Sequence, residues 1–415
     1  MIYCKQFDRK EENCAMENKN LPLVSVVIPT YNRIKTLPVS ISSVLNQTYR
    51  NLEVLIIDDG SDDGTEEYIK SIHDSRVKYR KSETNMGPSA ARNIGARLAR
   101  GEFLAFQDSD DEWRSDKLEK QMEFMLDNNN ISLVYCEFGM YQEGKLVGFW
   151  PSREISSLKK TDDIFSYLLV LPLISTQTMV LKRKEFMEEG GFNENLKAYE
   201  DFEFSLRFSR KHRIGFVGED LVRLNISPNS VSKRFGERIH TQFYMVREML
   251  DALREKQLLW DKMRIILNEA EKLKCHDVFI EELKQLSEEL KPGEEREKAA
   301  VYLEEIEYSK ENYLMKVGIC DHLLKLKQKV LEIYLGLYEK KMRWSDDLGA
   351  VLREILESVN TYGEIFAFPQ EVWVRQNAIN QKINIRSTQE IERLYLLTDL
   401  VELLEMVEKH IQYQL

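Results

Sequence analysis

Residues 103–113 read FLAFQDSDDEW, an apolar run that ends in a burst of carboxylates. Asp108, Asp110 and Asp111 follow one another closely, although like charges this near to each other repel. Either water solvates the cluster, as in an acidic turn that caps the next helix, or a cation holds it. Carboxylate oxygens suit hard divalent ions such as Mg²⁺ or Mn²⁺. Residues two apart on a strand share one face, so Asp108 and Asp110 are expected to reach one ion together if the strand continues that far.

Strand-like and helix-like segments alternate around this run. Short apolar, β-branched runs occur at 23–29 and 52–58, and further strand-like segments at 76–82 and 102–110. Segments of helical character separate these four at 34–47, 63–72 and 87–100. This rhythm predicts an α/β fold with a mostly parallel sheet and helices on both faces. In such sheets ligands bind beyond the carboxyl ends of the strands.

Polar residues gather at three of these strand ends. Tyr31 is suited to stacking on a base, and Thr30 or Asn32 to hydrogen bonding with a base edge or a ribose. Asp59, in the segment IDDGSDDGT, is suited to accepting a hydrogen bond from a base imide, although this segment also fits a helix-capping turn. Arg92 lies on the first turns of the helix after Gly87, where a guanidinium and a helix N-terminus both favour phosphate oxygens. The open alternative is that Arg92 pairs with a carboxylate at the sheet edge.

Four stretches in this order resemble the family 2 glycosyltransferases, which have the GT-A fold. They read VSVVIPTYNR, SISSVLNQTYRNLEVLIIDDGSDDGT, NMGPSAARNIGARLARGEFLAFQDSDDEW and GGFNENLKAYEDFEFSLR, and lie within residues 21–235. The resemblance implies inverting transfer of a sugar from a nucleotide-diphosphate sugar, most often a UDP-sugar, to an acceptor hydroxyl. It implies Mn²⁺ or Mg²⁺ as cofactor, held by Asp108 and Asp110, with Asp110 the direct ligand. The donor-binding residues that it implies are Pro29, Thr30, Tyr31, Asp59, Gly87, Arg92, Asp108 and Ser109.

The segment AYEDFEFSLRF looks like the family's Glu-Asp element. This likeness makes Asp201 the candidate catalytic base and Glu200 its neighbour, because an acceptor hydroxyl needs a carboxylate within reach to take its proton. The alternative is that Asp201 only caps the helix that follows it.

One departure concerns the metal site. The family often carries a His shortly before a Ser-x-Ser element, but here the segment reads VRLNISPNSVSKR. Ser230 and Ser232 match that element, and Asn225 or Ser227 stands near the place of the His. A third protein ligand to the metal is therefore in doubt, and Lys233 and Arg234 are alternatives for contact with the diphosphate.

Composition suggests three parts. We expect a flexible tail over residues 1–20, a GT-A catalytic domain over 21–235, and a helical bundle over 236–415, where proline nearly vanishes and Glu, Lys and Leu dominate. The bundle would brace the catalytic domain, or would mediate a homodimer or contact with a partner protein. A net charge of −11 argues against nucleic-acid binding. Five scattered cysteines and the absence of a long apolar run favour a cytoplasmic protein with at most peripheral contact at the inner face of the cell membrane.

The expected role is therefore in bacterial surface polysaccharide or glycoconjugate assembly, with a glycan, lipid-linked glycan or glycoprotein as acceptor. Two other classes stay open. A nucleotidyltransferase would normally carry a Gly-rich, basic loop after the first strand, and IPTYNR has none. An inactive sugar-nucleotide-binding or scaffold protein would act through the helical region, but Asp108, Asp110 and Asp201 are all present.

Overall fold

The computed structural model describes residues 21–151, 164–226, 234–338, 355–361, 368–384, 399–407 and 409. The expected tail over residues 1–20 and the residues Ser227, Ser230, Ser232 and Lys233 lie outside them. The chain divides into two compact units, one reaching Leu290 and one from Lys291 to Leu415. The division falls later than the change of composition near residue 236, so the first helices of the helical region belong to the same unit as the sheet.

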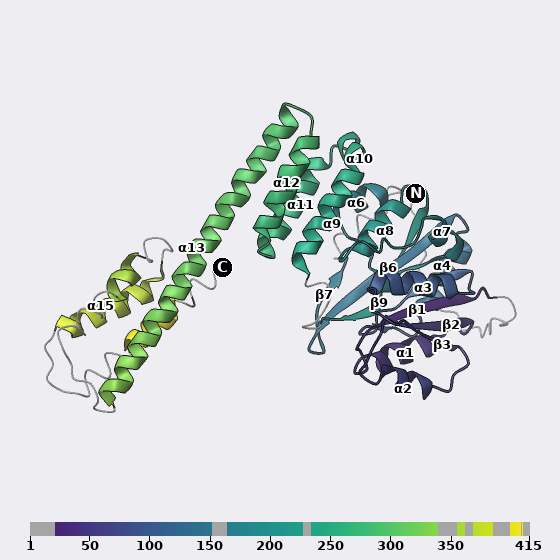
Figure 1. Ribbon diagram of the computed structural model, residues 1–415, viewed down its shortest axis with the longest axis horizontal. Coiled ribbons are helices and arrows are strands. Elements are labelled where there is room, and N and C mark those ends of the chain that lie inside the picture. The colour runs from purple at the N-terminus through teal and green to yellow at the C-terminus, as the bar shows by residue number, and fades with distance from the viewer. Residues whose placement is uncertain are drawn as a thin grey trace, which may run out of the picture. The chain divides into compact units, whose positions relative to one another are not determined.

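A nine-stranded sheet organises the first unit, in the order β3-β2-β1-β4-β8-β6-β9-β5, with β7 paired to β6 (Figure 1). Its strands are β1 (Val24–Thr30), β2 (Leu52–Asp58), β3 (Val77–Lys81), β4 (Phe103–Phe106), β5 (Glu112–Trp113), β6 (Ile131–Gln142), β7 (Lys145–Trp150), β8 (Val180–Lys182) and β9 (Arg213–Asn225). The predicted parallel sheet is confirmed for β3, β2, β1 and β4. Beyond β4 the sheet is mixed, because β8, β7 and β5 join it antiparallel.

Helices cover both faces of the sheet, as the sequence predicts. They are α1 (Leu37–Leu45), α2 (Thr65–Lys70), α3 (Pro88–Leu98), α4 (Lys117–Asp127), α6 (Ile164–Val170), α7 (Arg183–Glu188) and α8 (Glu200–Phe208). Alternate residues of β1 point to opposite faces. Val26 and Ile28 therefore join α1 and α4 in one core cluster, while Val27 lies against Gly95 of α3 on the other face.

Pro29 sits near the end of β1, where a missing N–H disturbs the sheet little. The carbonyl of Val27 accepts a hydrogen bond from Gln107, so Val27 and Pro29 both present their backbone toward the β4 side. β4 pairs with β1 only as far as Val27, opposite Phe106. The proline therefore lies beyond the neighbouring strand, as proline in a sheet requires.

The rest of the first unit is helical. It comprises α9 (Phe235–Glu248), α10 (Leu250–Glu255), α11 (Leu259–Lys272) and α12 (His276–Glu289). Figure 1 shows α9, α11 and α12 side by side, and Phe243 of α9 packs edge-on against Phe279 of α12. Lys262 of α11 lies over the Phe202 ring of α8, so this helical layer is in direct contact with the helix that carries the candidate base.

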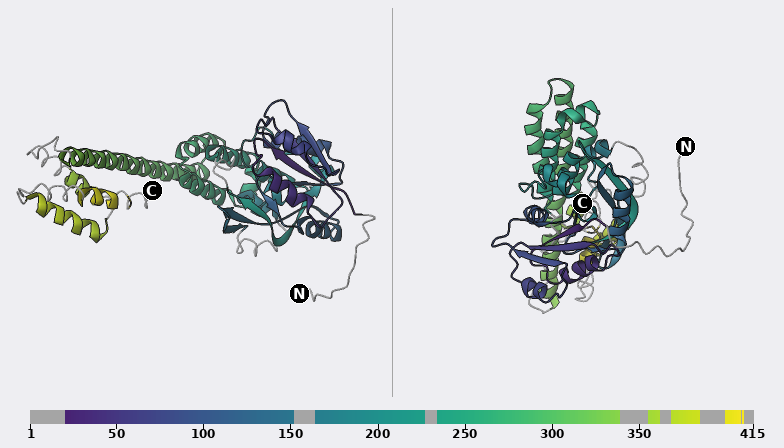
Figure 2. Two further views of the ribbon diagram at one scale, coloured as in Figure 1. Left: turned by 90° about the horizontal axis from the view of Figure 1, so that it is seen from below. Right: turned by 90° about the vertical axis from the view of Figure 1, so that its right-hand side faces the viewer.

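The second unit is built on one long helix. α13 (Glu294–Tyr338) is continuous, and its C-terminal half packs against α15 (Gln370–Asn384) and the helical segments 355–361 and 399–407. The left view of Figure 2 shows the yellow C-terminal helical segments beside the far end of α13. No helix in the described ranges combines the length and apolar character needed to cross a bilayer.

Candidate functional site

Two loops at the carboxyl ends of β1 and β2 are joined by hydrogen bonds. The Thr30 carbonyl accepts a hydrogen bond from the Asp59 N–H at 2.8 Å. The backbone N–H of Asn32 donates to Ser61 Oγ at 2.9 Å, and Asn32 Oδ1 accepts from the Asp62 N–H at 2.9 Å. Asn32 has a φ of 52°, a left-handed conformation that Asn adopts more readily than most residues. The two loops therefore form one structured edge.

The predicted donor-binding residues Thr30 and Tyr31 lie at this edge with free hydrogen-bonding and stacking capacity. Tyr31 is 47% exposed, so its ring is available to a base. Thr30 is buried, and its Oγ1 has no hydrogen-bond partner among the described residues. A buried hydroxyl without a partner is costly in a folded protein and is common where a ligand completes the site.

Asp59 links this edge to the loop before α3. Its Oδ1 accepts a hydrogen bond from the Met86 N–H at 2.9 Å, and its Oδ2 accepts one from the Gly87 N–H at 2.7 Å. Burial raises the pKa of Asp59, and the neighbouring Asp58 raises it further, although the two N–H donors oppose this shift. The structure brings Asp59 and Gly87 together, and whether Asp59 also binds a base remains a prediction.

The acidic cluster lies on a turn, which corrects the expectation that a continuing strand places its carboxylates on one face. β4 ends at Phe106. The Asp108 carbonyl then accepts hydrogen bonds from the Asp111 N–H at 3.2 Å and from Ser40 Oγ at 2.9 Å. The turn between Asp108 and Asp111, rather than the pleat of a strand, sets the directions of the carboxylates, and Ser109 is buried within it.

Asp110 and Asp111 experience the mutual repulsion that the sequence implies. Burial and the Asp108 carboxylate raise the pKa of Asp110, and Arg33, whose Nη2 lies 3.8 Å from Asp110 Oδ2, opposes this. The pKa of buried Asp111 is raised for the same reasons. Asn225 at the end of β9 donates its N–H to Asp111 Oδ1 and its Nδ2 to the Asp110 carbonyl, both at 2.9 Å. The residue near the place of the family's His thus contacts the acidic turn.

Arg92 bridges two carboxylates that come from distant parts of the chain. Its Nη2 lies 2.7 Å from Asp108 Oδ1, and its Nη1 lies 2.7 Å from Glu200 Oε1. The Arg92 side chain is only 6% exposed. The structure therefore contains the carboxylate pairing that was the alternative for Arg92, and a contact with the donor stays a prediction.

Asp201 stands at the start of α8, beside this bridge. It accepts hydrogen bonds from the Phe202 N–H at 2.8 Å and the Thr176 N–H at 3.2 Å, so it also satisfies backbone donors near the helix start. Burial and the adjacent Glu200 raise the pKa of Asp201 to about 7, although Arg92 opposes the shift. A carboxylate with a pKa near neutrality is suited to exchanging a proton with a substrate.

The acidic turn fits a divalent ion whose coordination shell is completed by a bound ligand. Asp108 and Asp110 supply carboxylate oxygens, and their side chains remain 26% and 22% exposed. Within the described parts of the chain, no cluster of three or more His, Cys, Asp or Glu side chains is arranged to hold a metal. Mg²⁺ usually binds through one or two carboxylates together with phosphates and water, so an open pair of this kind suits it.

The sequence did not point to Arg33, Tyr199 or Thr176 as parts of the site. Arg33 follows Asn32 directly, so its position after a strand end was a usable signal. Tyr199 and Thr176 reach the site through contacts that depend on the packing of α8. Trp150 donates its indole N–H to the Pro172 carbonyl at 2.9 Å and packs against the main core.

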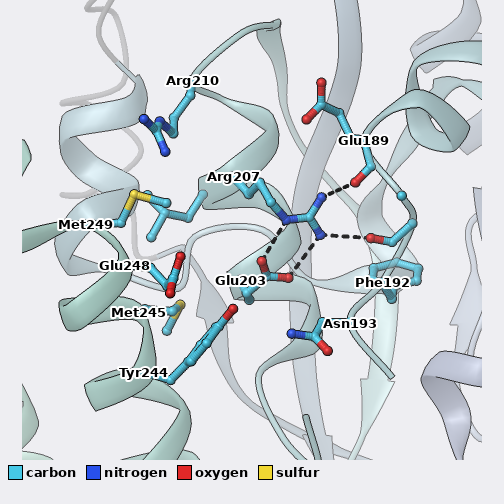
Figure 3. A pocket seen from close by; sticks show the side chains of 13 residues that line it. Glu189, Phe192, Asn193, Glu203, Arg207, Arg210, Tyr244, Met245, Glu248 and Met249 are labelled. Atoms are coloured by element: carbon cyan, nitrogen blue, oxygen red, sulfur yellow. Dashed lines mark hydrogen bonds and ion pairs between the residues drawn. The ribbon is translucent and has the colours of Figure 1, made fainter. Parts of the chain in front are cut away.

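A separate pocket of about 340 Å³ lies behind α8 and shares no residue with the predicted site (Figure 3). Its floor is a closed ion pair in which Arg207 Nε lies 2.7 Å from Glu203 Oε1. Arg207 also donates to the carbonyls of Glu189 and Gly191. Because these groups satisfy one another, we interpret the ion pair as an anchor that holds α8 to the turn at residues 189–191.

Comparisons with known proteins identify the family of this chain. Residues 25–190 match the family model described as glycosyl transferase family 2. An uncharacterized glycosyltransferase of Haemophilus influenzae is 39% identical over 246 residues, which cover 57% of this chain and 92% of that protein. An uncharacterized glycosyltransferase of Rickettsia conorii is 36% identical over 49% of this chain but over only 33% of its own length.

Two further comparisons concern the fold and a relative with a named activity. The Staphylococcus aureus TarS fragment 1–349, solved in complex with UDP-GlcNAc, superimposes with a TM-score of 0.54 at 19% identity, over 69% of this chain and 88% of that one, which establishes a shared GT-A fold. The Escherichia coli UDP-Glc:alpha-D-GlcNAc-diphosphoundecaprenol beta-1,3-glucosyltransferase WfgD is 44% identical over 126 residues, 30% of this chain and 49% of that protein. The match to the Haemophilus protein over nearly its full length, together with the family model, shows that this chain belongs to glycosyl transferase family 2.

Proposed function

We propose that this chain transfers a sugar, with inversion, from a UDP-linked or related nucleotide-diphosphate sugar to an acceptor hydroxyl in the assembly of a bacterial surface glycan. The observation that carries the proposal is the bridge from Arg92 to Asp108 and Glu200. It holds the acidic turn, where a diphosphate would bind, next to Asp201, whose raised pKa suits a base. Relatives that use or bind UDP-sugars, WfgD and TarS, support the choice of donor.

In the proposed reaction Asp201 accepts the proton of the acceptor hydroxyl. The hydroxyl oxygen forms a bond to the anomeric carbon while the bond from that carbon to the diphosphate oxygen breaks, so the nucleoside diphosphate leaves with the electron pair. A single displacement of this kind inverts the anomeric centre. Asp108 and Asp110 would hold the divalent ion, which when bound offsets negative charge on the diphosphate. Thr30, Tyr31 and Asp59 orient the nucleoside.

Acceptors that fit the proposal are glycans, lipid-linked glycans and glycoproteins presented at the cytoplasmic face of the membrane. The name of WfgD specifies a diphosphoundecaprenol-linked acceptor for that protein, and an acceptor of this chemical class is our first choice here. We further propose that residues 236–415 brace the catalytic sheet, and that dimerisation or partner binding is a second role for the same residues.

The proposal is tested with a panel of nucleotide sugars and Mn²⁺. We expect at least one UDP-sugar to raise the melting temperature, since a ligand that binds the native state stabilises it, and to release UDP slowly by hydrolysis. Asp110→Asn should remove the Mn²⁺-dependent part of the shift. Asp116→Asn is the matched control, because that carboxylate pairs with Lys120 at the surface. A protein that hydrolyses no donor and binds donors equally well without Asp110 would instead be an inactive scaffold.

A further inference from the structure

Tyr199, the residue before Glu200, has an unusual backbone conformation. Its φ of 58° and ψ of 27° place it in the left-handed region at the start of α8. An aromatic residue in this region is strained, and such strain costs on the order of 1–3 kcal/mol unless surrounding contacts hold the residue there. Because Tyr199 immediately precedes Glu200 and Asp201, its conformation sets the direction in which both carboxylates leave the backbone.

Side chains from two helices of the helical layer hold the Tyr199 side chain. Its hydroxyl donates to Glu269 Oε1 of α11 at 3.0 Å and accepts a hydrogen bond from Arg238 of α9. Arg238 Nη2 also lies 2.5 Å from Glu269 Oε1, and the Arg238 guanidinium carbon lies 4.7 Å from the centre of the Tyr199 ring. The ring also packs edge-on against Phe202.

Three further hydrogen bonds and one cation–π contact connect α9 and α11 with each other, with α8 and with the turn before it. Gln242 Nε2 donates to Glu269 Oε2 at 2.7 Å, and buried Lys262 donates from Nζ to Gln242 Oε1 at 2.9 Å. Lys262 Nζ lies 4.7 Å from the centre of the Phe202 ring. Thr241 Oγ1 donates to the carbonyl of Ala198, the residue before Tyr199, at 3.0 Å. The turn that leads into Glu200 and Asp201 is thus held by α9 and α11.

We propose that Tyr199, fixed by Arg238 and Glu269, is a positioning residue that aims the Glu200 and Asp201 carboxylates. The inference rests on the proposed role of Asp201 as the base. It assigns a function to helices α9 and α11, which follow the last strand and lie beyond residues 25–190, the stretch matched by the family model. The hydroxyl of Tyr199 has no contact with the substrate in this scheme and acts through the backbone of the next two residues.

The test uses the full chain and the variant Tyr199→Phe, which keeps the ring but loses the hydroxyl. The protonation of Asp201 is measured by carbon NMR on protein labelled at the aspartate carboxyl carbons. The Asp201 signal is identified as the one that is missing in Asp201→Asn. The charged groups that face Asp201 are Glu200 and Arg92. We expect Tyr199→Phe to move the Asp201 titration midpoint to lower pH, because a loosened turn admits water. UDP release from UDP-glucose or UDP-GlcNAc should fall on the order of tenfold to a hundredfold with little change in KM.

Two further variants separate positioning from general stability. Arg238→Lys should retain more of the rate than Arg238→Met, because Lys keeps the charge opposite Glu269. Arg247→Met is the matched control, since Arg247 of α9 pairs with Glu282 of α12 at 2.7 Å and has no contact with Tyr199. It should lower the melting temperature and leave the Asp201 midpoint unchanged. If Tyr199→Phe does not fold, Glu269→Gln is measured in the same way.

The possible results distinguish this inference from the proposed function. A wild-type midpoint and rate in Tyr199→Phe overturn the inference, and so does a loss of rate that only parallels the loss of melting temperature seen in Arg247→Met. If Asp201→Asn keeps near-normal hydrolysis, the assignment of the base fails, and the positioning role fails with it. If Asp201→Asn is inactive while Tyr199→Phe is normal, only the positioning role fails. The NMR titration gives a result even when no donor on the panel is hydrolysed.

Discussion

Asp108 and Glu200 share one guanidinium, although they lie on different sides of the candidate site. Asp108 follows β4 and Glu200 begins α8, and Arg92 of α3 lies 2.7 Å from each of them. Burial alone would lower the pKa of Arg92, but the two nearby carboxylates stabilise its charged form and raise the pKa. One buried cation therefore couples the turn proposed to bind the metal to the segment that carries the proposed base.

Replacing Arg92 should damage both stability and transfer. Arg92→Met leaves two partly buried carboxylates without their partner, and breaking a buried ion pair in this way costs about 3–5 kcal/mol. Arg92→Lys should recover only part of the loss, because a single ammonium cannot hold two carboxylates as a planar guanidinium does. Chemical denaturation measures the free energy of unfolding, and UDP release measures the effect on rate.

Arg100→Met is the matched control for the Arg92 variants. Arg100 pairs with Glu53, whose buried carboxylate also pairs with Lys78. Arg100→Met therefore leaves Glu53 with a charged partner and should cost less stability than Arg92→Met. If Arg92→Met is no more destabilising than Arg100→Met, the bridge between the acidic turn and α8 is not a structural element of the site.

Thr30→Val tests whether the buried Thr30 hydroxyl is kept for a ligand. Oγ1 has no partner among the described residues, so removing it should leave the free energy of unfolding unchanged or raise it by about 1 kcal/mol. The KM for the donor should rise severalfold. Thr178→Val is the contrasting variant, because the Thr178 hydroxyl donates to the Ser175 carbonyl at 2.6 Å. Thr178→Val should lower the free energy of unfolding by about 1 kcal/mol and leave the KM for the donor unchanged. A stability loss in Thr30→Val would mean that its hydroxyl has a structural role.

The sequence was sufficient for the parts of the site that follow from local pattern. Apolar runs that end in Thr30, Asp59 and Asp108 predicted the three neighbouring strand ends, because parallel strands present their carboxyl ends at one edge. Asn225 was identified as standing near the place of a missing His, and it does contact the acidic turn. The strand ends need only the order of residues along the chain, whereas the inference about Asn225 also needs the resemblance to the family.

The remaining features depend on tertiary packing, which local pattern does not encode. The end of β4 at Phe106 is set by its pairing with β1 and β8, so the acidic residues form a turn instead of extending the strand. The contact of Tyr199 with Glu269 joins helices that no periodicity relates. The sequence also placed a boundary at residue 236, where the composition changes, although the first compact unit continues to Leu290.

The raised pKa of Asp201 predicts opposite effects of pH on activity and stability. The base must be deprotonated, so hydrolysis and transfer should fall as the pH drops below about 7. The folded-state pKa lies above the ordinary value of 3.8, so the native state binds the proton more tightly. The contribution of Asp201 to the free energy of unfolding is therefore present at low pH and is lost as the pH rises from 3.8 to about 7.

Asp201→Asn checks both effects in one variant. Asn keeps a carbonyl acceptor for the Phe202 N–H but cannot ionise. The variant should therefore be more stable than wild type at pH 8, where Asp201 is charged, and nearly equal to wild type in stability at pH 4. Donor binding should persist while transfer is largely lost. Melting curves at the two pH values measure the stability difference. A stability difference that does not change with pH would show that Asp201 titrates normally in the folded protein.

Gly95 provides a test of how α3 is placed on the sheet. A Cβ added at Gly95 would lie 2.3 Å from Val27 Cγ1, so α3 and Arg92 rest directly on β1. Ala usually stabilises a helix interior by about 0.5–1 kcal/mol relative to Gly. Here the clash should outweigh that gain and cost about 1–3 kcal/mol. Gly318→Ala in α13, where no atom of the described residues lies within 4 Å of the added Cβ, should be neutral or stabilising.

The double variant Gly95→Ala/Val27→Ala identifies the clash as the cause. Val27→Ala alone should destabilise the protein by creating a cavity, but in the Gly95→Ala background it makes room for the new methyl group. The two changes should therefore be non-additive, with the double variant more stable than the sum of the single effects predicts. Because a shifted α3 also moves Arg92, Gly95→Ala should slow UDP release, and the double variant should recover part of the rate. Additive losses in stability, with no recovery of rate, would show that α3 adapts without moving the Arg92 bridge.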